Sequence, residues 1–95
     1  MMVTGSAIGD PDGTVVELTE ERWNHIVDRH PEIGPFRELV LRAVQRPDRR
    51  TQGRQANEEW YYVRTHLPSD WLKVVVACAG GRGHIVTAHA TKSTP

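Results

Sequence analysis

The chain has 95 residues and no formal net charge, because 12 Lys and Arg balance 12 Asp and Glu. This length predicts a single domain with a thin core. No apolar run is long enough to span a membrane, there is no signal-peptide core, and the lone Cys78 cannot form an internal disulfide. We therefore expect a cytoplasmic protein without a membrane partner.

Charge is distributed unevenly although its sum is zero. Acidic residues dominate up to Glu32. Arginines then crowd one stretch, at Arg42, Arg46, Arg49, Arg50 and Arg54. Arginine presents a rigid fork of donors that matches a phosphate. Two interpretations stay open: this stretch is either an RNA-facing patch or a solvated helix face followed by a basic loop.

The N-terminal segment is rich in Gly, Ser, Asp and Pro and has no periodicity. We expect residues 1–13 to form a flexible tail that ends in a turn at residues 10–13. Residues 14–95 then form the single domain, which begins with a short edge strand over residues 14–18.

Two amphipathic helices are predicted next. Thr19 is suited to cap the first helix and Pro31 to end it. The apolar stripe of this helix consists of Trp23, Ile26, Val27 and His30. Pro35 opens the second helix, which ends before Pro47. Its stripe consists of Phe36, Leu39, Val40, Ala43 and Val44. Two short helices joined by a few residues predict an α-helical hairpin.

The periodicity then changes to two. Residues 59–67, 71–79 and 84–91 are rich in Val, Ile, Tyr, Trp and Thr and predict strands, and residues 48–52 are a further candidate. Helices followed by an antiparallel meander indicate an α+β domain.

Alternation along these strands separates the two faces of the sheet. The face that the helices cover is expected to carry Val63, Val74, Val76, Val86 and Ala88. The opposite face collects Trp60, Tyr62, Arg64, Lys73, Ile85, Thr87 and His89. Aromatic and cationic side chains together are typical of surfaces that stack on single-stranded RNA, but an ordinary solvated sheet face is polar too.

The histidines divide between two expected roles. His30 lies on the apolar stripe of the first helix and His84 shares the core face of its strand, which favours structural roles. His25 and His89 are freer to meet a ligand. His25 and His30 are five residues apart, so they do not form the i, i+4 pair of a helical zinc site. We expect neither a metal nor another cofactor.

The run from residue 18 to residue 91 resembles the phage-associated members of the barnase–EndoU–colicin–RelE (BECR) nuclease superfamily. The matching segments are RWNHI (22–26), RHPE (29–32), RPD (46–48), WYYVR (60–64), KVVV (73–76) and IVTAH (85–89). Their order and spacing span about four-fifths of the chain. The resemblance implies an N-terminal α-helical hairpin packed on one face of a four-stranded antiparallel β-sheet.

The resemblance also implies a toxin-like, metal-independent endoribonuclease, in which the 2′-hydroxyl attacks the adjacent phosphate and leaves a 2′,3′-cyclic phosphate. Members of this superfamily use a His or Lys from the helical part, a strand Arg, and a Ser, Thr or His near the last strand. In this chain those residue types fall on His25, His30, Arg64, Thr87 and His89. Candidate substrate-binding residues are Arg29, Trp60, Tyr62 and Lys73.

The partners implied are an RNA substrate and an acidic antitoxin or immunity protein. A second interpretation comes from another class of protein. The same fold is also suited to a catalytically inactive binding module or a phage-related protein-interaction domain. The neutral net charge and the lack of a complete catalytic triad favour this alternative.

Overall fold

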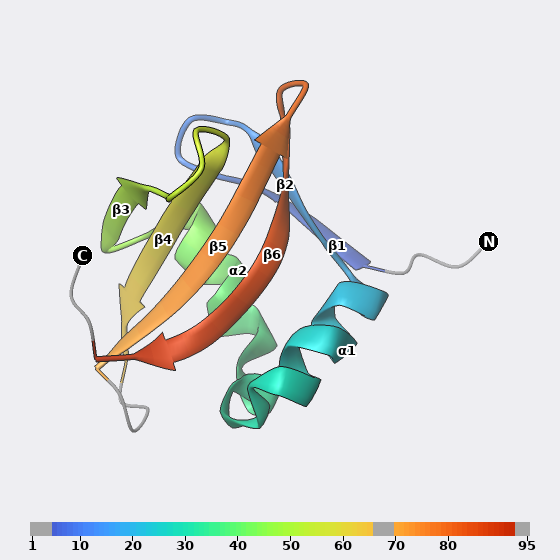
Figure 1. The fold of residues 1–95 in the computed structure, drawn as a ribbon, viewed down its shortest axis with the longest axis vertical. Coiled ribbons are helices and arrows are strands. Elements are labelled where there is room, and N and C mark those ends of the chain that lie inside the picture. The colour runs from blue at the N-terminus through green and yellow to red at the C-terminus, as the bar shows by residue number, and fades with distance from the viewer. Residues whose placement is uncertain (1–4, 66–69, 93–95) are drawn as a thin grey trace.

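In the computed structural model, residues 5–65 and 70–92 are described, and they form a six-stranded mixed sheet with helices packed against it (Figure 1). The elements follow in chain order as β1 (Gly5–Gly9), β2 (Val15–Thr19), α1 (Glu20–Arg29), the 3-10 helix η1 (Pro31–Phe36), α2 (Arg37–Gln45), β3 (Arg49–Gln52), β4 (Glu58–Arg64), β5 (Trp71–Ala79) and β6 (Arg82–Thr91). The strand order is β1-β2-β6-β5-β4-β3, in which β2 and β6 are parallel and the other neighbours antiparallel.

The predicted helical hairpin on a four-stranded antiparallel sheet is wrong. β1 and β2 form a hairpin that joins the sheet through the parallel pairing of β2 with β6. β2 is therefore an interior strand, not the predicted edge strand, and its Val16 and Leu18 are each 1% exposed. The helices pack separately, because α1 contacts β2 and β6 while α2 contacts β1, β4 and β5 (Figure 1).

The N-terminal segment also differs from the prediction. Residues 5–9, expected to belong to a flexible tail, form β1, and residues 1–4 lie outside the described part of the chain. The turn at residues 10–13 is confirmed by the hydrogen bond from the Gly13 amide to the Asp10 carbonyl, at 2.9 Å. The positive φ of Gly13, 86°, suits glycine at this turn.

The other strand predictions hold with small changes in their bounds. The expected strands over residues 59–67, 71–79 and 84–91 correspond to β4, β5 and β6, and the candidate over residues 48–52 corresponds to β3. Residues 66 and 67 lie outside the described residues. Among the helices of residues 5–65 and 70–92, none is long and apolar enough to cross a membrane.

The predicted packing of the second helix on β5 is confirmed for Val40 and Val44. The helix begins at Arg37 and not at Pro35, so Phe36 lies in η1, and both Phe36 and Leu39 are only half-buried. Val40 and Val44 of α2 are fully buried, as are Val74 and Val76 of β5, and all four belong to one hydrophobic cluster. Lys73 alternates with these residues and lies on the opposite face of the strand, so the predicted register of β5 is correct.

A bulge in β6 changes the register that simple alternation predicts. Val75 pairs with Thr87 but Val76 pairs with Ile85, so Val86 is an extra residue on β6. Ile85 is therefore 1% exposed in the core, whereas Val86 is only half-buried, which reverses the predicted faces of these two residues. A bulge inserts one residue and shifts every side chain beyond it to the other face.

The bulge also moves His84. Its predicted place on the core face is wrong, because His84 is exposed on the outer side of β6. His84, Thr87 and His89 consequently share the face of β6 that the core does not occupy, on either side of the bulge. Bulges are frequent next to functional sites because they redirect side chains in this way.

A buried polar cluster links the two edges of the curved sheet. The Tyr61 hydroxyl on β4 donates a 2.7 Å hydrogen bond to Oδ2 of Asp10, which follows β1. Arg50 on β3 also binds this oxygen, at 3.3 Å. Asp10 Oδ1 accepts the backbone amides of Asp12 and Thr14, both at 2.9 Å. The carboxylate thus accepts hydrogen bonds from four donors, which compensates for its burial, since Asp10 is only 7% exposed.

Candidate functional site

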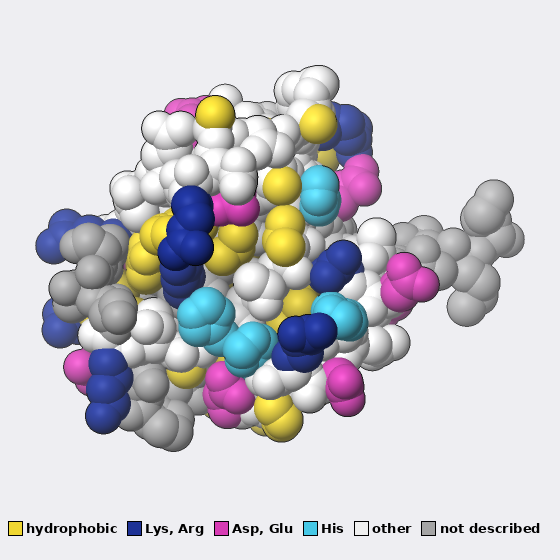
Figure 2. All heavy atoms as spheres, viewed as in Figure 1, with side chains coloured by type: hydrophobic (Ala, Val, Ile, Leu, Met, Phe, Trp, Pro, Cys, Tyr) yellow, Lys and Arg dark blue, Asp and Glu magenta, His cyan; other side chains and the backbone are white. Residues whose placement is uncertain are grey.

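A groove runs along the seam between α1 and β6, on the face shown in Figure 2. Its largest section, which we call the histidine section, has a volume of about 370 Å³. This section is lined by Arg22, His25, Arg29, His30, Val86, Thr87 and His89. Figure 2 shows histidine and cationic side chains gathered here, with acidic side chains around them.

The packing of α1 determines which side chains enter the groove. Trp23 and Ile26 are buried, so they fix the face of the helix that meets the core. Arg22, His25 and Arg29 follow the spacing i, i+3, i+7 and consequently share the flank that looks towards β6. The helix begins at the N-cap Thr19, whose hydroxyl accepts the Arg22 amide at 3.0 Å.

His30 lies at the C-terminal end of α1, where its amide donates to the Ile26 carbonyl at 2.8 Å. The sequence predicted a core histidine on the apolar stripe. In the structure its side chain is 34% exposed and reaches the groove, because the chain leaves the helix at this residue before Pro31.

His30 and His89 form a stacked pair with ring centroids 5.2 Å apart and planes 30° apart. Glu32 Oε2 lies 3.9 Å from Nδ1 of His30. Burial lowers the pKa of His89 below the ordinary histidine value, and the neighbouring His30 and Lys73 lower it further, against the opposing effect of Glu32. His89 is thus biased towards the neutral imidazole at neutral pH.

Arg22 is the functional candidate that sequence reasoning did not select. Its Nη1 donates to the Val86 carbonyl at 3.4 Å, which holds the guanidinium across the groove. The bulge at Val86 presents this carbonyl to the helix. The spacing of Arg22 with His25 and Arg29 on one helix flank was the signal available in the sequence.

Arg64 does not line the groove. It lies on β4, separated from β6 by β5, and its guanidinium packs over the Trp71 ring at 5.2 Å. Its amide donates to Asp48 Oδ2 at 2.8 Å. The structure therefore brings together His25, His30, Thr87, His89 and Arg29 from the predicted set, and leaves Arg64 outside.

The predicted aromatic platform is largely covered. Tyr62 is 4% exposed and meets Trp71 edge-on, so its ring face is not open to a base. Trp60 is half-buried, and Lys73 Nζ lies 3.4 Å from its ring centroid. Lys73 itself is the register partner of His89, which explains its effect on that imidazole. Burial and Arg54 lower the pKa of Lys73.

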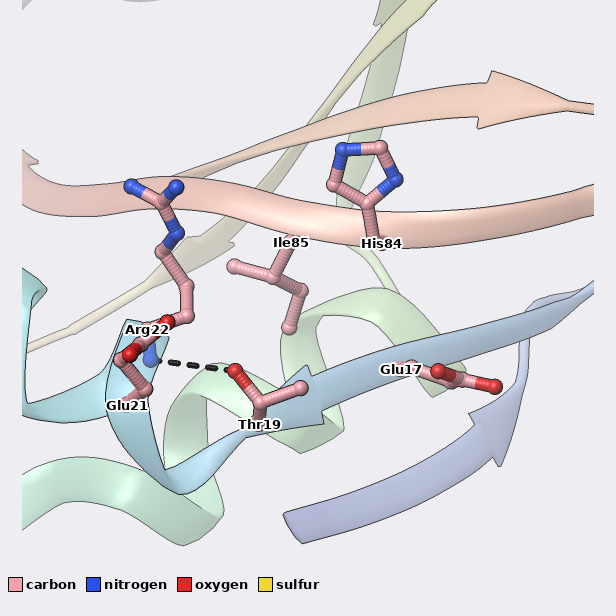
Figure 3. A pocket seen from close by; sticks show the side chains of 6 residues that line it. All are labelled: Glu17, Thr19, Glu21, Arg22, His84 and Ile85. Carbon is pink, nitrogen blue, oxygen red and sulfur yellow. Dashed lines mark hydrogen bonds between the residues drawn. The ribbon is translucent and has the colours of Figure 1, made fainter. Parts of the chain in front are cut away.

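The groove continues beyond the histidine section towards the start of α1. A connecting cavity of about 180 Å³ is lined by Glu21, Arg22 and His25. Beyond it lies what we call the acidic section, with a volume of about 200 Å³ (Figure 3). Its lining residues are Glu17, Thr19, Glu21, Arg22, His84 and Ile85. Arg22 lines all three cavities, so they adjoin one another beside this side chain.

Across residues 5–65 and 70–92, no group of three or more His, Cys, Asp or Glu side chains is arranged to hold a metal ion. Comparison with known proteins gives no relative: no family model matches the chain, and no match was found among curated proteins or solved structures.

Proposed function

We propose that this protein is a metal-independent endoribonuclease of the BECR type, which cleaves RNA in the α1–β6 groove. The observation that supports this most is the close approach of His30 and His89 in a cavity also lined by Arg22 and Thr87. Cleavage by the substrate's own 2′-hydroxyl needs a base, an acid and positive charge beside one phosphate, and this cavity holds groups suited to each role.

His89 is assigned as the general base. Its lowered pKa favours the neutral imidazole, which accepts the proton of the 2′-hydroxyl as the 2′-oxygen forms a bond to phosphorus. His30 is assigned as the general acid and gives a proton to the 5′-oxygen as its bond to phosphorus breaks. Glu32, 3.9 Å from Nδ1, is placed to orient this imidazole. The products are a 2′,3′-cyclic phosphate and a free 5′-hydroxyl.

Arg22 is assigned to stabilise the negative charge that builds on the phosphate oxygens. Its hydrogen bond to the Val86 carbonyl fixes one side of the guanidinium and leaves other donors for the substrate. The Thr87 hydroxyl donates a hydrogen bond to a phosphate oxygen. Arg29, exposed at the margin of the groove, contributes to phosphate binding.

An acidic antitoxin or immunity protein is the partner that this function implies. A cell that makes such a nuclease needs an inhibitor, and the cationic side chains of Arg22 and Arg29 in the groove fit an acidic partner.

The test is cleavage of bulk RNA by the full chain in the presence of EDTA, with analysis of the product ends. We expect cleavage with cyclic phosphate ends, and no cleavage of DNA. Replacing His30 or His89 by Asn is expected to lower the rate by roughly 10²–10⁴-fold. Glu38→Gln, an exposed change on α2 outside the groove, is the control for general damage. RNA that stays intact at high protein concentration would favour the inactive binding module instead.

A further inference from the structure

The arginine-rich stretch over residues 42–57 lies outside the residues that line the groove. It holds five arginines and a single carboxylate, Asp48, which accepts a backbone amide of β4 at 2.8 Å. Arg50 turns inward and pairs with three carboxylates. Arg49 and Arg54 are exposed, and within residues 5–65 and 70–92 neither forms an ion pair. Their charges are therefore available to a ligand.

The strand that carries this charge has one unpaired side. β3 lies at an edge of the sheet and pairs only with β4 among the described strands (Figure 1). The Gly53 amide, directly after β3, donates to a carbonyl of β4 at 2.9 Å. Since hydrogen-bonded residues alternate in an antiparallel pair, Thr51 and Arg49 also direct their backbone groups at β4. Arg50 and Gln52 direct their amides and carbonyls away from it, where a further strand can pair with them.

The two exposed arginines lie beside this unpaired side, on the outer face of the sheet. Arg49 is the register partner of Tyr62, which is in turn the register partner of Lys73 on that face. Arg54 lies close enough to Lys73 to add to the effect of burial in lowering its pKa. We call the unpaired side of β3, with Arg49 and Arg54 on its outer face, the arginine edge. Figure 2 shows cationic side chains at the margin of the molecule where Figure 1 places β3.

The chemistry of the arginine edge favours one kind of occupant, an extended acidic peptide. A strand completes the backbone ladder, and carboxylates at every second position meet Arg49 and Arg54. A second copy of this edge would set arginine against arginine, which opposes self-association. Residues 42–57 contain no aromatic side chain, and Tyr62 beside them is only 4% exposed, so an RNA base finds no stacking surface here.

We propose that the arginine edge docks an extended acidic segment of a partner protein, which adds one strand to the sheet beside β3. The acidic residues of this segment alternate along it and lie on the outer face. Positions on the inner face gain little from charge, because the Arg50 guanidinium is already held by three carboxylates. β4 and β5 separate β3 from the groove at β6, so this docking does not depend on the proposed cleavage.

The experiment uses a synthetic peptide with blocked ends, in which Glu alternates with Thr over about eight residues, the length of a common strand. It is titrated into the isotope-labelled full chain and followed by NMR. We expect the Arg50 and Gln52 amides to shift and to exchange hydrogen more slowly, because both gain acceptors. The exchange of the Thr51 amide, which already pairs with β4, should change little.

Three further peptides separate strand pairing from charge attraction. A peptide with Gln in place of Glu removes the charge and should bind roughly tenfold or more weakly. Two others carry backbone N-methyl groups on all Glu residues or on all Thr residues. Only one of these two sets faces β3 in a paired strand, so one peptide should lose binding roughly tenfold or more while the other keeps it.

Variants of the protein assign the charge. Arg49→Gln and Arg54→Gln should each weaken binding of the Glu peptide roughly two- to fivefold, the range expected of an exposed ion pair. Lys92→Gln removes an exposed positive charge next to β6 and is the matched control, which should keep the wild-type Kd.

Several results would overturn the proposal. They are no binding of the Glu peptide, equal affinity for the two N-methylated peptides, or shifts confined to the groove. An oligouridylate that binds more tightly than the Glu peptide, with shifts at Arg50 and Gln52, would assign the arginine edge to nucleic acid instead.

Discussion

His30 at the end of α1 and His89 on β6 lie with their ring centroids 5.2 Å apart. Two unrelated features of the fold produce this pair. The chain leaves α1 at His30 ahead of Pro31, and the bulge at Val86 sets the register of the outer face of β6. The pair gives the groove two titratable groups within reach of one phosphate, and one of them has a lowered pKa.

The pH dependence of activity follows from the charges around His89. Because its pKa lies below the ordinary value, the proposed base should stay neutral, and cleavage should persist, to lower pH than an unperturbed histidine would allow. Lys73→Gln removes a positive charge that lowers this pKa, so the pKa of His89 and the acidic limb of the rate profile should both move to higher pH. An NMR titration of the His89 ring measures the shift without relying on activity.

Lys92→Gln is the matched control, since Lys92 is exposed and is not among the charges that act on His89. A His89 titration that is unchanged in Lys73→Gln, or that moves equally in Lys92→Gln, would remove the electrostatic explanation.

The assignment of the charge-stabilising arginine gives a direct contrast between two residues. Arg22→Ala should lower kcat/KM by about two orders of magnitude or more, because its guanidinium lies in the groove. Arg64→Ala should change it by less than about tenfold, because that side chain packs on Trp71 away from the groove. The reverse ranking in a cleavage assay would return the role to Arg64, as the sequence alone suggested.

Stability should depend on the Asp10 carboxylate. Burial alone would raise its pKa, but hydrogen bonds from Tyr61 and the backbone, together with Arg50, lower it overall. A lowered folded-state pKa stabilises the protein above the unfolded value of about 3.9, and this contribution is lost as pH falls through the folded pKa. Asp10→Asn should therefore be less stable than wild type at pH 7, by about 1–3 kcal/mol, with the gap narrowing below about pH 4.

Urea unfolding at pH 7 and below about pH 4 measures the difference in stability between Asp10→Asn and wild type. Asp28→Asn, an exposed change on α1, serves as the control. A gap between Asp10→Asn and wild type that stays constant from neutral to acidic pH would contradict the role of the ionised carboxylate.

The bulge in β6 predicts opposite consequences for two adjacent residues. Ile85→Ala should destabilise the fold by about 2–5 kcal/mol, because Ile85 is buried in the core. Val86→Ala should cost less than about 1 kcal/mol, because Val86 is only half-buried and its carbonyl, not its side chain, binds Arg22. If chemical unfolding showed similar losses of stability for the two variants, side chains would alternate regularly between the two faces in this part of β6, without a bulge.

Local sequence patterns were sufficient to predict the position of most of the helices and strands. Thr19 marks the start of α1 as its N-cap, and Pro31 marks its end. The alternation of Val74 and Val76 identifies the face of β5 that packs in the core. These signals act within a few residues, so they can be read along the chain. The same patterns placed His25 and His89 among the candidates that the groove brings together.

Non-local pairing explains what the sequence did not predict. β2 pairs in parallel with β6 near the other end of the chain, and neither segment encodes its partner. The inserted residue, Val86, is apolar like its neighbour Ile85, so the alternation of apolar and polar residues gives no sign of an inserted position. The core assignment of His30 is wrong for the same reason, since it depends on how α1 meets β6. That contact also brings Arg22 into the groove and leaves Arg64 outside it.

In the proposed reaction, the substrate's own 2′-hydroxyl performs the attack without a metal. A single-stranded DNA oligonucleotide with one internal ribonucleotide, incubated with the full chain in EDTA, tests this most directly. We expect one cut, directly after the ribonucleotide, that leaves a 2′,3′-cyclic phosphate, and no cut in the all-DNA strand. The ribonucleotide is a guanosine in one substrate and a uridine in another, and His89→Asn provides the inactive control. Cleavage at deoxynucleotides, loss of cleavage on adding EDTA, or no cut in any ribonucleotide-containing strand or in bulk RNA would contradict it.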